Sequence, residues 1–173
     1  EEALIRVGLP YRIYGGQRFY ERLEIRNALA YMRLIIGRGD DPALERIINT
    51  PTRGIGSKTV DDLRAIAREN NVSMWQAIGL AQQNGLLGSR ARSSLSGFAA
   101  LINELDSETV ELPLEEMVEH VIHRTGLIEF HKAETGERGQ ARVENLEELV
   151  SAAKTFRADD DSLSSLQQFL DSA

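Results

Sequence analysis

Residues 49–60, NTPTRGIGSKTV, place two glycines on either side of one isoleucine, between two stretches of helical periodicity. Such a turn would gather the backbone N–H groups of Gly54, Gly56 and Ser57 at a helix N-terminus, where the partial positive charge favours an anion. The polar side chains around the same point are those of Thr52, Arg53, Ser57, Lys58 and Thr59. Donors of this kind position a protein on a nucleic-acid backbone. The stretch therefore predicts a phosphate contact that reads no base, and a purely structural turn is the alternative interpretation.

The chain carries no recognisable catalytic pattern. It has no GxxxxGK[ST] phosphate loop, no His–Glu metal spacing and no Ser/His/Asp arrangement on a nucleophile elbow. Without cysteine it can form neither a disulfide nor a thiolate metal site. His120, His123 and His131 fall on or beside expected helices, where a solvent-facing or core-edge role is favoured. We therefore predict no catalytic residue, no metal site and no cofactor in this chain.

A second glycine-containing stretch, residues 135–149 with sequence TGERGQARVENLEEL, carries Arg138, Gln140 and Arg142 beside two glycines. Its simplest interpretation is a helix that starts on the surface. The alternative is a second contact with DNA or with another domain.

Composition indicates a folded chain without membrane segments. The 173 residues are 42% hydrophobic and 27% charged, and no apolar run approaches the roughly 20 residues of a bilayer span. The acidic start, EEALIRVGLP, does not resemble a signal peptide, so we expect a cytoplasmic protein. The net charge of −7 is uneven, because residues 1–70 carry 12 basic and 10 acidic side chains and residues 71–173 carry 8 and 17. The glycine turn thus lies in the mildly basic part.

Apolar periodicity and capping residues predict a nearly all-helical chain. Asp40 with Pro42, Ser57 and Ser73 are expected to start three helices, and Pro113 with Gly126 to bound another. Residues 127–139 are expected to be broken by glycines, and an acidic cap is expected to start the last helix. Ile55 should pack the glycine turn onto its neighbours. The expected helices cover residues 18–36, 40–49, 58–70, 72–83, 89–108, 113–126, 140–156 and 159–173.

One strand is expected, in LPYRIYGG near the N-terminus. A lone strand exposes unpaired backbone groups and cannot stand alone. We therefore expect residues 1–20 to belong to an adjacent domain, and residues 21–173 to form a separate helical domain.

Taken together, PYRIYGGQRFYERLEIRNALAYMRL, NTPTRGIGSKTVDDL and GERGQARVENLEELV resemble, in this order and spacing, a segment of the UvrD/Rep/PcrA family of superfamily 1 DNA helicases. The resemblance covers essentially the whole chain. It implies an all-α, multi-helix accessory subdomain inserted into the second RecA-like motor domain, preceded by one orphan strand of that domain.

The resemblance also implies roles for individual residues. The glycine turn becomes a helix-hairpin-helix-like element that contacts the duplex backbone at a fork through Thr52, Arg53, Gly54, Ile55, Gly56, Ser57, Lys58 and Thr59. A helicase motif at the hinge to the motor domain falls on Gly15, Gly16, Phe19, Arg22, Glu24 and Ile25. The family's usual acidic residue after this motif is Asn27 here, so a charge-pairing role at that position is in doubt.

For the parent protein the resemblance implies ATP-driven unwinding from three-prime to five-prime in DNA repair or replication, with ATP and Mg²⁺ bound outside this segment. The implied partners are duplex DNA, the motor domains of the same parent chain, and repair proteins. A different class of function remains open, in which the acidic helices form a protein-interaction or autoinhibitory platform and the glycine hairpin is only structural.

Overall fold

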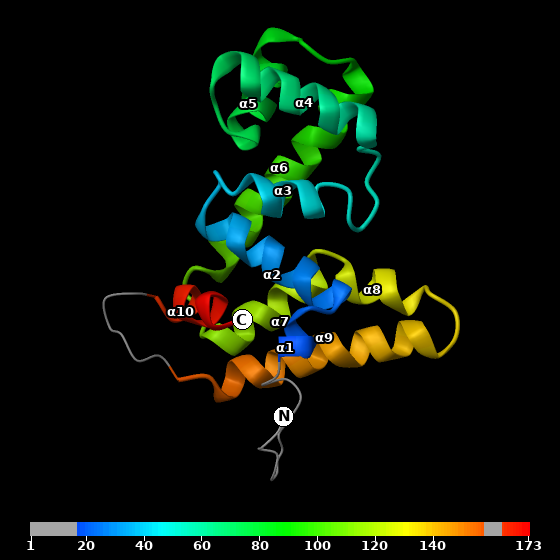
Figure 1. Ribbon diagram of the computed structural model, residues 1–173, viewed down its shortest axis with the longest axis vertical. Coiled ribbons are helices and arrows are strands. Elements are labelled where there is room, and N and C mark those ends of the chain that lie inside the picture. Colours follow the sequence, from blue (N-terminus) through cyan, green and yellow to red (C-terminus); the bar gives the residue numbers. More distant parts are fainter. Residues whose placement is uncertain (1–16, 158–163) are drawn as a thin grey trace. The chain divides into compact units, whose positions relative to one another are not determined.

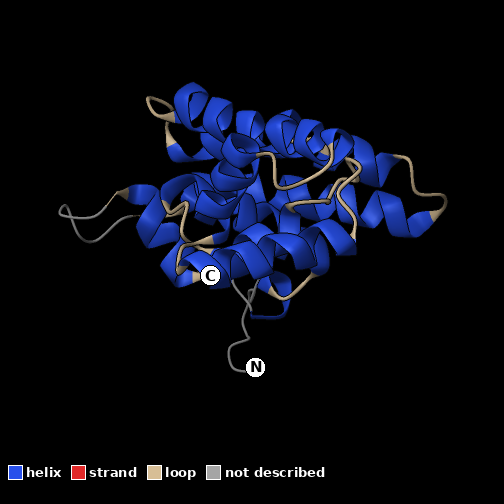
Figure 2. Ribbon diagram, turned by 90° about the horizontal axis from the view of Figure 1, so that it is seen from above, coloured by secondary structure: helices blue, strands red, loops and turns tan. Residues whose placement is uncertain are grey.

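The computed structural model describes residues 17–157 and 164–173, and these residues form helices and loops without a strand (Figure 2). The predicted all-α fold class is confirmed for them. The expected N-terminal strand, Gly15 and Gly16 lie outside the described residues. The helices are α1 Gln17–Tyr20, α2 Leu23–Ile36, α3 Asp41–Ile47, α4 Ser57–Asn70, α5 Met74–Asn84, α6 Ser89–Thr109, α7 Leu114–Arg124, α8 Leu127–Lys132, α9 Glu137–Thr155 and α10 Ser165–Ser172.

The chain divides into two compact units, which we call unit 1 (Glu1–Leu29 and Glu111–Ala173) and unit 2 (Ala30–Val110). In unit 2, α4 packs against α5, and α5 also contacts α3 and α6 (Figure 1). The core of unit 2 is apolar and includes Leu44, Ile47, Leu63, Ala77 and Phe98.

In unit 1, α7 and α8 both pack against α9, and α7 also contacts α8 (Figure 1). The buried face of α9 supplies Leu146 and Leu149, which lie in a core with apolar side chains of α7. Phe169 of α10 packs edge-on against Phe156, with ring centroids 5.5 Å apart. Each unit therefore has its own buried apolar side chains.

Local capping signals fixed several helix starts as expected. Asp40 accepts a hydrogen bond from the Ala43 N–H at the start of α3, and Ser73 forms a reciprocal capping box with Gln76 at the start of α5. Ser57 was predicted to cap α4, but Gly56 occupies the cap position and Ser57 is the first helical residue. Thus α4 begins one residue earlier than the Ser57 cap implied.

Two further sequence predictions are corrected. The last helix is capped by the Ser164 side chain, which accepts from the Gln167 N–H, and the acidic run expected to cap it lies outside the described residues. Residues 127–139 were expected to be broken by glycines, and the chain does break at Gly136, which has φ of +80° before α9, but the stretch also contains the short helix α8. Gly139 does not break the chain, because it lies inside α9, where its missing side chain allows close packing.

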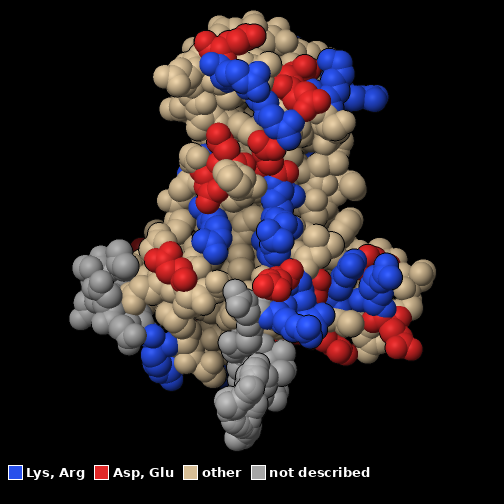
Figure 3. Space-filling model, in the orientation of Figure 1, with Lys and Arg blue, Asp and Glu red and all other residues tan. Residues whose placement is uncertain are grey.

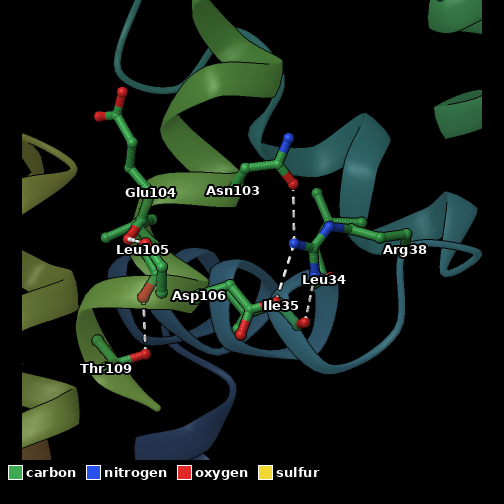
Figure 4. A network of polar contacts seen from close by, with 9 residues as sticks. Leu34, Ile35, Arg38, Asn103, Glu104, Leu105, Asp106 and Thr109 are labelled. Carbon is green, nitrogen blue, oxygen red and sulfur yellow. Dashed lines mark hydrogen bonds and ion pairs between the residues drawn. The ribbon is translucent and has the colours of Figure 1, made fainter.

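An arginine network joins the end of α2 to α6 within unit 2 (Figure 4). The Arg38 guanidinium donates to the carbonyls of Leu34 and Ile35, to Asn103 Oδ1 at 2.9 Å and to Asp106 Oδ2 at 3.1 Å. Because the last carbonyls of a helix have no helical partner, the guanidinium satisfies them and orients α6 against α2.

Candidate nucleic-acid interface

The glycine hairpin connects α3 to α4 in unit 2 and is exposed along one side. Gly54, Gly56, Ser57 and Lys58 are exposed, whereas Ile55 is only 1% exposed. Ile55 therefore packs the turn onto its helices, as the sequence predicted. The alternation of exposed glycine and buried isoleucine turns the backbone of both glycines toward solvent.

The Asn49 side chain holds the hairpin from inside. Its Oδ1 accepts from the Arg53 N–H at 2.7 Å and from the Ile55 N–H at 3.1 Å. The Tyr31 hydroxyl adds a second brace by donating to the Thr50 carbonyl at 2.6 Å. Neither residue was predicted from the sequence to hold the hairpin. Asn49 had a local signal, since asparagine readily hydrogen-bonds nearby backbone in turns, but Tyr31 lies 19 residues before its acceptor.

Arg53 is engaged internally. Its Nη1 donates to the Ile47 and Ile48 carbonyls at 2.6 and 2.9 Å, and its Nη2 donates to the Tyr31 hydroxyl at 2.6 Å. The guanidinium also lies 5.3 Å from the centroid of the Phe98 ring. Burial raises the pKa of Tyr31, and the Arg53 charge partly opposes that shift. These contacts make Arg53 a structural residue of the hairpin, and its predicted contact with DNA stays a prediction.

Replacing Arg53 with alanine is expected to destabilise the chain by about 2 kcal/mol, because the helix-end carbonyls and the buried hydroxyl lose charged donors. Urea denaturation followed by circular dichroism would measure this. Lys58→Ala is the matched control, since its side chain is 88% exposed and its removal should change stability by less than about 0.5 kcal/mol. Equal stability of both variants would contradict the structural role of Arg53.

The first turn of α4 offers backbone donors. The N–H groups of Ser57, Lys58 and Thr59 have no helical partner by position, and neither they nor those of Gly54 and Gly56 donate to an acceptor within the described residues. Gly54 has φ of +81°, which favours glycine, and a Cβ there would lie 3.2 Å from Ser94 Oγ. Gly56 has φ of −86° and open space around its Cβ position. An anion could thus approach this backbone closely.

Charges around the hairpin are mixed. Lys58 Nζ lies 3.2 Å from Asp62 Oδ2, and Arg64 pairs with Glu45 at 2.6 Å and with Asp61. On the face drawn in Figure 3, Lys and Arg side chains lie among Asp and Glu rather than in an unbroken basic surface. The attraction for an anion at this site therefore comes from backbone N–H groups and one exposed lysine more than from a broad positive patch.

The other predicted residues lie in unit 1, where the structure brings parts of two sequence motifs together. Arg22 and Glu24 of the hinge motif line one cleft with Arg138 and Arg142 of α9. Gln140 does not join them, because its side chain is exposed and donates to Glu144 Oε2 at 3.2 Å. Phe19 and Ile25 are core residues, with 2% and 0% of their surface exposed.

A buried polar network underlies this cleft. Glu24 is 3% exposed, and its carboxylate accepts from Asn145 Nδ2 at 2.8 Å and lies 3.8 Å from Arg142 Nε. Arg142 Nη1 also donates to Glu134 Oε2 at 2.8 Å, and the other Glu134 oxygen lies 2.9 Å from His131 Nδ1. The hydrogen bond from His131, followed by the charge of Arg142, lowers the pKa of Glu134 against the effect of burial.

Two residues of unit 1 are more buried than their sequence positions suggested. His131 was expected at the surface or the core edge, but its side chain is fully buried, with Nδ1 bonded to Glu134 and Nε2 without a hydrogen-bond partner among the described residues. Asn27, which stands where the resemblance expects an acidic residue, is 4% exposed and lies in the core. Asn145 and Glu134 were not identified from sequence.

Two absences bear on chemistry. No cluster of three or more His, Cys, Asp or Glu that could hold a metal ion occurs within residues 17–157 and 164–173. None of the described helices combines the length and apolar character that a bilayer crossing needs.

Comparison with known proteins identifies the family. All 173 residues match the family model of the UvrD-like helicase C-terminal domain. The chain is 54% identical over 156 residues to DNA helicase II of Haemophilus influenzae, covering 90% of this chain and 22% of that protein. It is 48% identical over 175 residues to DNA helicase II of Escherichia coli, covering 100% of this chain and 24% of that protein.

A more distant relative is the ATP-dependent DNA helicase PcrA of Staphylococcus aureus, which is 36% identical over 156 residues, covering 90% of this chain and 21% of that protein. The chain therefore spans less than a quarter of the length of these relatives. Because the family model matches its whole length, this chain belongs to the UvrD-like helicase C-terminal domain family.

Proposed function

We propose that this chain is the accessory subdomain of a UvrD-type ATP-dependent DNA helicase, and that it binds the backbone of duplex DNA and regulates unwinding. The observation that carries the proposal is the glycine hairpin. Its exposed backbone at Gly54 and Gly56 leads directly into the N-terminus of α4, where N–H groups have no acceptor among the described residues.

The hairpin suits phosphate binding without sequence preference. A duplex phosphate would accept from the backbone N–H groups of Gly56, Ser57 and Lys58, and the exposed Lys58 ammonium would add a charge contact. The Asn49 bonds hold the loop before DNA arrives, so little conformational freedom is lost on binding. No side chain of this set is placed to read a base edge.

ATP hydrolysis is assigned to other parts of the parent protein. The sequence has no phosphate loop, and no described acidic cluster could hold Mg²⁺. The residues present therefore do not fit a nucleotide site, and no step of the reaction is derived through ATP here. The role proposed for this segment is to hold the duplex while motor domains of the same parent chain translocate along the product strand.

The interaction-platform function is the competing proposal, and one observation favours it. Because the Arg53 guanidinium is occupied by carbonyls and Tyr31, the hairpin has fewer cations available for DNA than its sequence suggests. In that case the hairpin would serve only to connect α3 to α4.

Salt dependence separates the two proposals. We expect weak binding of a fluorescently labelled duplex by this chain, with an affinity that falls between about 50 mM and 200 mM salt and a logarithmic slope of roughly −1 to −2. Fluorescence anisotropy would measure both quantities. No detectable binding at the low-salt end would contradict a phosphate-binding hairpin and favour the interaction platform.

A further inference from the structure

A separate cleft in unit 1 lies between the start of α2 and one face of α9. Its volume is about 330 Å³, which is within the range of small-ligand pockets of about 300–1,000 Å³. α9 contributes Arg138, Ala141, Arg142 and Asn145, which are spaced at one-turn intervals on a single helix face. α2 and the residue before it contribute Arg22, Leu23 and Glu24.

The more buried charged residues of this cleft, Glu24 and Arg142, already have polar partners within the protein. Glu24 is held by Asn145 Nδ2 at 2.8 Å, with Arg142 Nε 3.8 Å from its other oxygen. Arg142 is also held by Glu134 at 2.8 Å. These groups are fixed by one another, and a ligand would have to displace a buried pair to use them.

The rim, by contrast, carries two uncommitted cations. Arg22 and Arg138 are exposed, and neither side chain makes a hydrogen bond or ion pair within the described residues. The cleft lining carries three arginines and one glutamate, so its charge is positive. Leu23, which is half exposed, and Ala141 add apolar surface to the lining of the same cleft.

We infer that this cleft binds a phosphodiester group of a nucleic-acid strand, with Arg22 and Arg138 donating to the phosphate and Leu23 with Ala141 packing against the attached sugar. A phosphate presents several oxygens in three dimensions and can accept from two guanidinium forks at once, whereas one fork saturates a planar carboxylate. At about 330 Å³ the cleft also exceeds what one carboxylate would fill. The inference rests on the proposed function for its ligand class, but it uses none of the hairpin residues.

The test is anisotropy binding of this chain to two labelled probes, a short single-stranded oligodeoxythymidylate and a mixed-sequence duplex. The pocket variant is Arg22→Gln with Arg138→Gln. The control variant is Arg26→Gln with Lys154→Gln, which removes one exposed cation from each of the same two helices outside the cleft. Circular dichroism melting should change little for the pocket variant, because neither guanidinium makes a hydrogen bond or close ion pair within the described residues and the charge of Arg138 acts on Glu134 only as a minor influence.

We expect the pocket variant to lose on the order of tenfold in affinity for at least one probe, with a salt slope shallower by about one per guanidinium. The control variant should bind within about twofold of wild type on the same scale. The probe that loses more identifies whether single-stranded or duplex DNA supplies the phosphate. Unchanged binding of both probes by the pocket variant, or no binding by wild type, would overturn the inference.

Two further arms make failures distinguishable. When Gly56→Asp is already present, the pocket variant should still lose the same factor in DNA affinity, because the two sites share no residue. If Gly56→Asp alone leaves duplex binding unchanged while the pocket variant weakens it, the proposed hairpin function is wrong and the cleft remains supported. A labelled polyglutamate peptide covers the competing ligand class. If the pocket variant weakens the peptide's binding and leaves both DNA probes unaffected, the cleft binds an acidic protein segment and the phosphodiester assignment is wrong.

Discussion

Replacing Gly56 with aspartate is expected to weaken duplex binding by tenfold or more, equivalent to ~1.4 kcal/mol, without destabilising the chain. The carboxylate would stand at the N-terminus of α4, where the proposed phosphate accepts its hydrogen bonds. It would satisfy the backbone N–H groups itself and repel the phosphate at short range. The repulsion acts only when the phosphate is bound, whereas the capping bonds form in the free protein and must be broken for the phosphate to bind.

The geometry of Gly56 makes this a clean test. Its φ of −86° and ψ of −178° are ordinary extended values, and nothing lies within 4 Å of a Cβ placed there. It also occupies the N-cap position, where aspartate is among the preferred residues and should add a few tenths of a kcal/mol of stability. A loss of DNA binding therefore cannot be attributed to misfolding. Gly54 offers no such test, since its φ is +81°.

Gly56→Asn is the matched control, because asparagine has the size and capping ability of aspartate without the charge. Anisotropy with the labelled duplex should show a large loss for the aspartate variant and a smaller one for the asparagine variant. If both variants bind duplex as wild type does, the hairpin is a structural turn, and the interaction platform becomes the better account of this segment.

Local signals in the sequence predicted the parts of the fold that depend on neighbouring residues. Asp40 and Ser73 cap their helices within three residues, so their roles are readable from spacing alone. The burial of Ile55 was likewise predicted, because an apolar side chain between two turn glycines is expected to pack against the flanking helices. The hairpin's position between two helices follows from the same local patterns.

Contacts between distant residues were not predictable in this way. The Asn145 to Glu24 hydrogen bond spans 121 residues, and the Arg53 to Tyr31 bond spans 22. The charge of Arg53, its place in the glycine hairpin and the family resemblance predicted a DNA-binding cation, whereas in the structure its guanidinium donates to carbonyls at the C-terminal end of α3. Arg22 and Arg138 line the same cleft only because the start of α2 lies beside α9 in the fold, and no local sequence pattern predicts that arrangement.

Gly139 shows how one such contact governs the packing of unit 1. It lies inside α9, and a Cβ built there would be 2.5 Å from the His131 carbonyl oxygen and 2.7 Å from that of Glu134. These are backbone atoms at the end of α8 and just beyond it, so they cannot move aside as a flexible side chain could. The close approach also brings α9 beside the His131, Glu134 and Arg142 network.

Gly139→Ala is therefore expected to destabilise unit 1 by about 3 kcal/mol, at the upper end of overpacking costs, even though alanine favours helix. Gly97→Ala is the matched control, because Gly97 is an exposed residue inside α6 with nothing within 4 Å of its Cβ position, and it should stabilise the chain by up to about 1 kcal/mol. Urea denaturation followed by circular dichroism would measure both. If alanine lowers the free energy of unfolding at position 139 and raises it at position 97, the end of α8 packs directly against the backbone of α9 at Gly139. A stabilised Gly139→Ala protein would refute that packing.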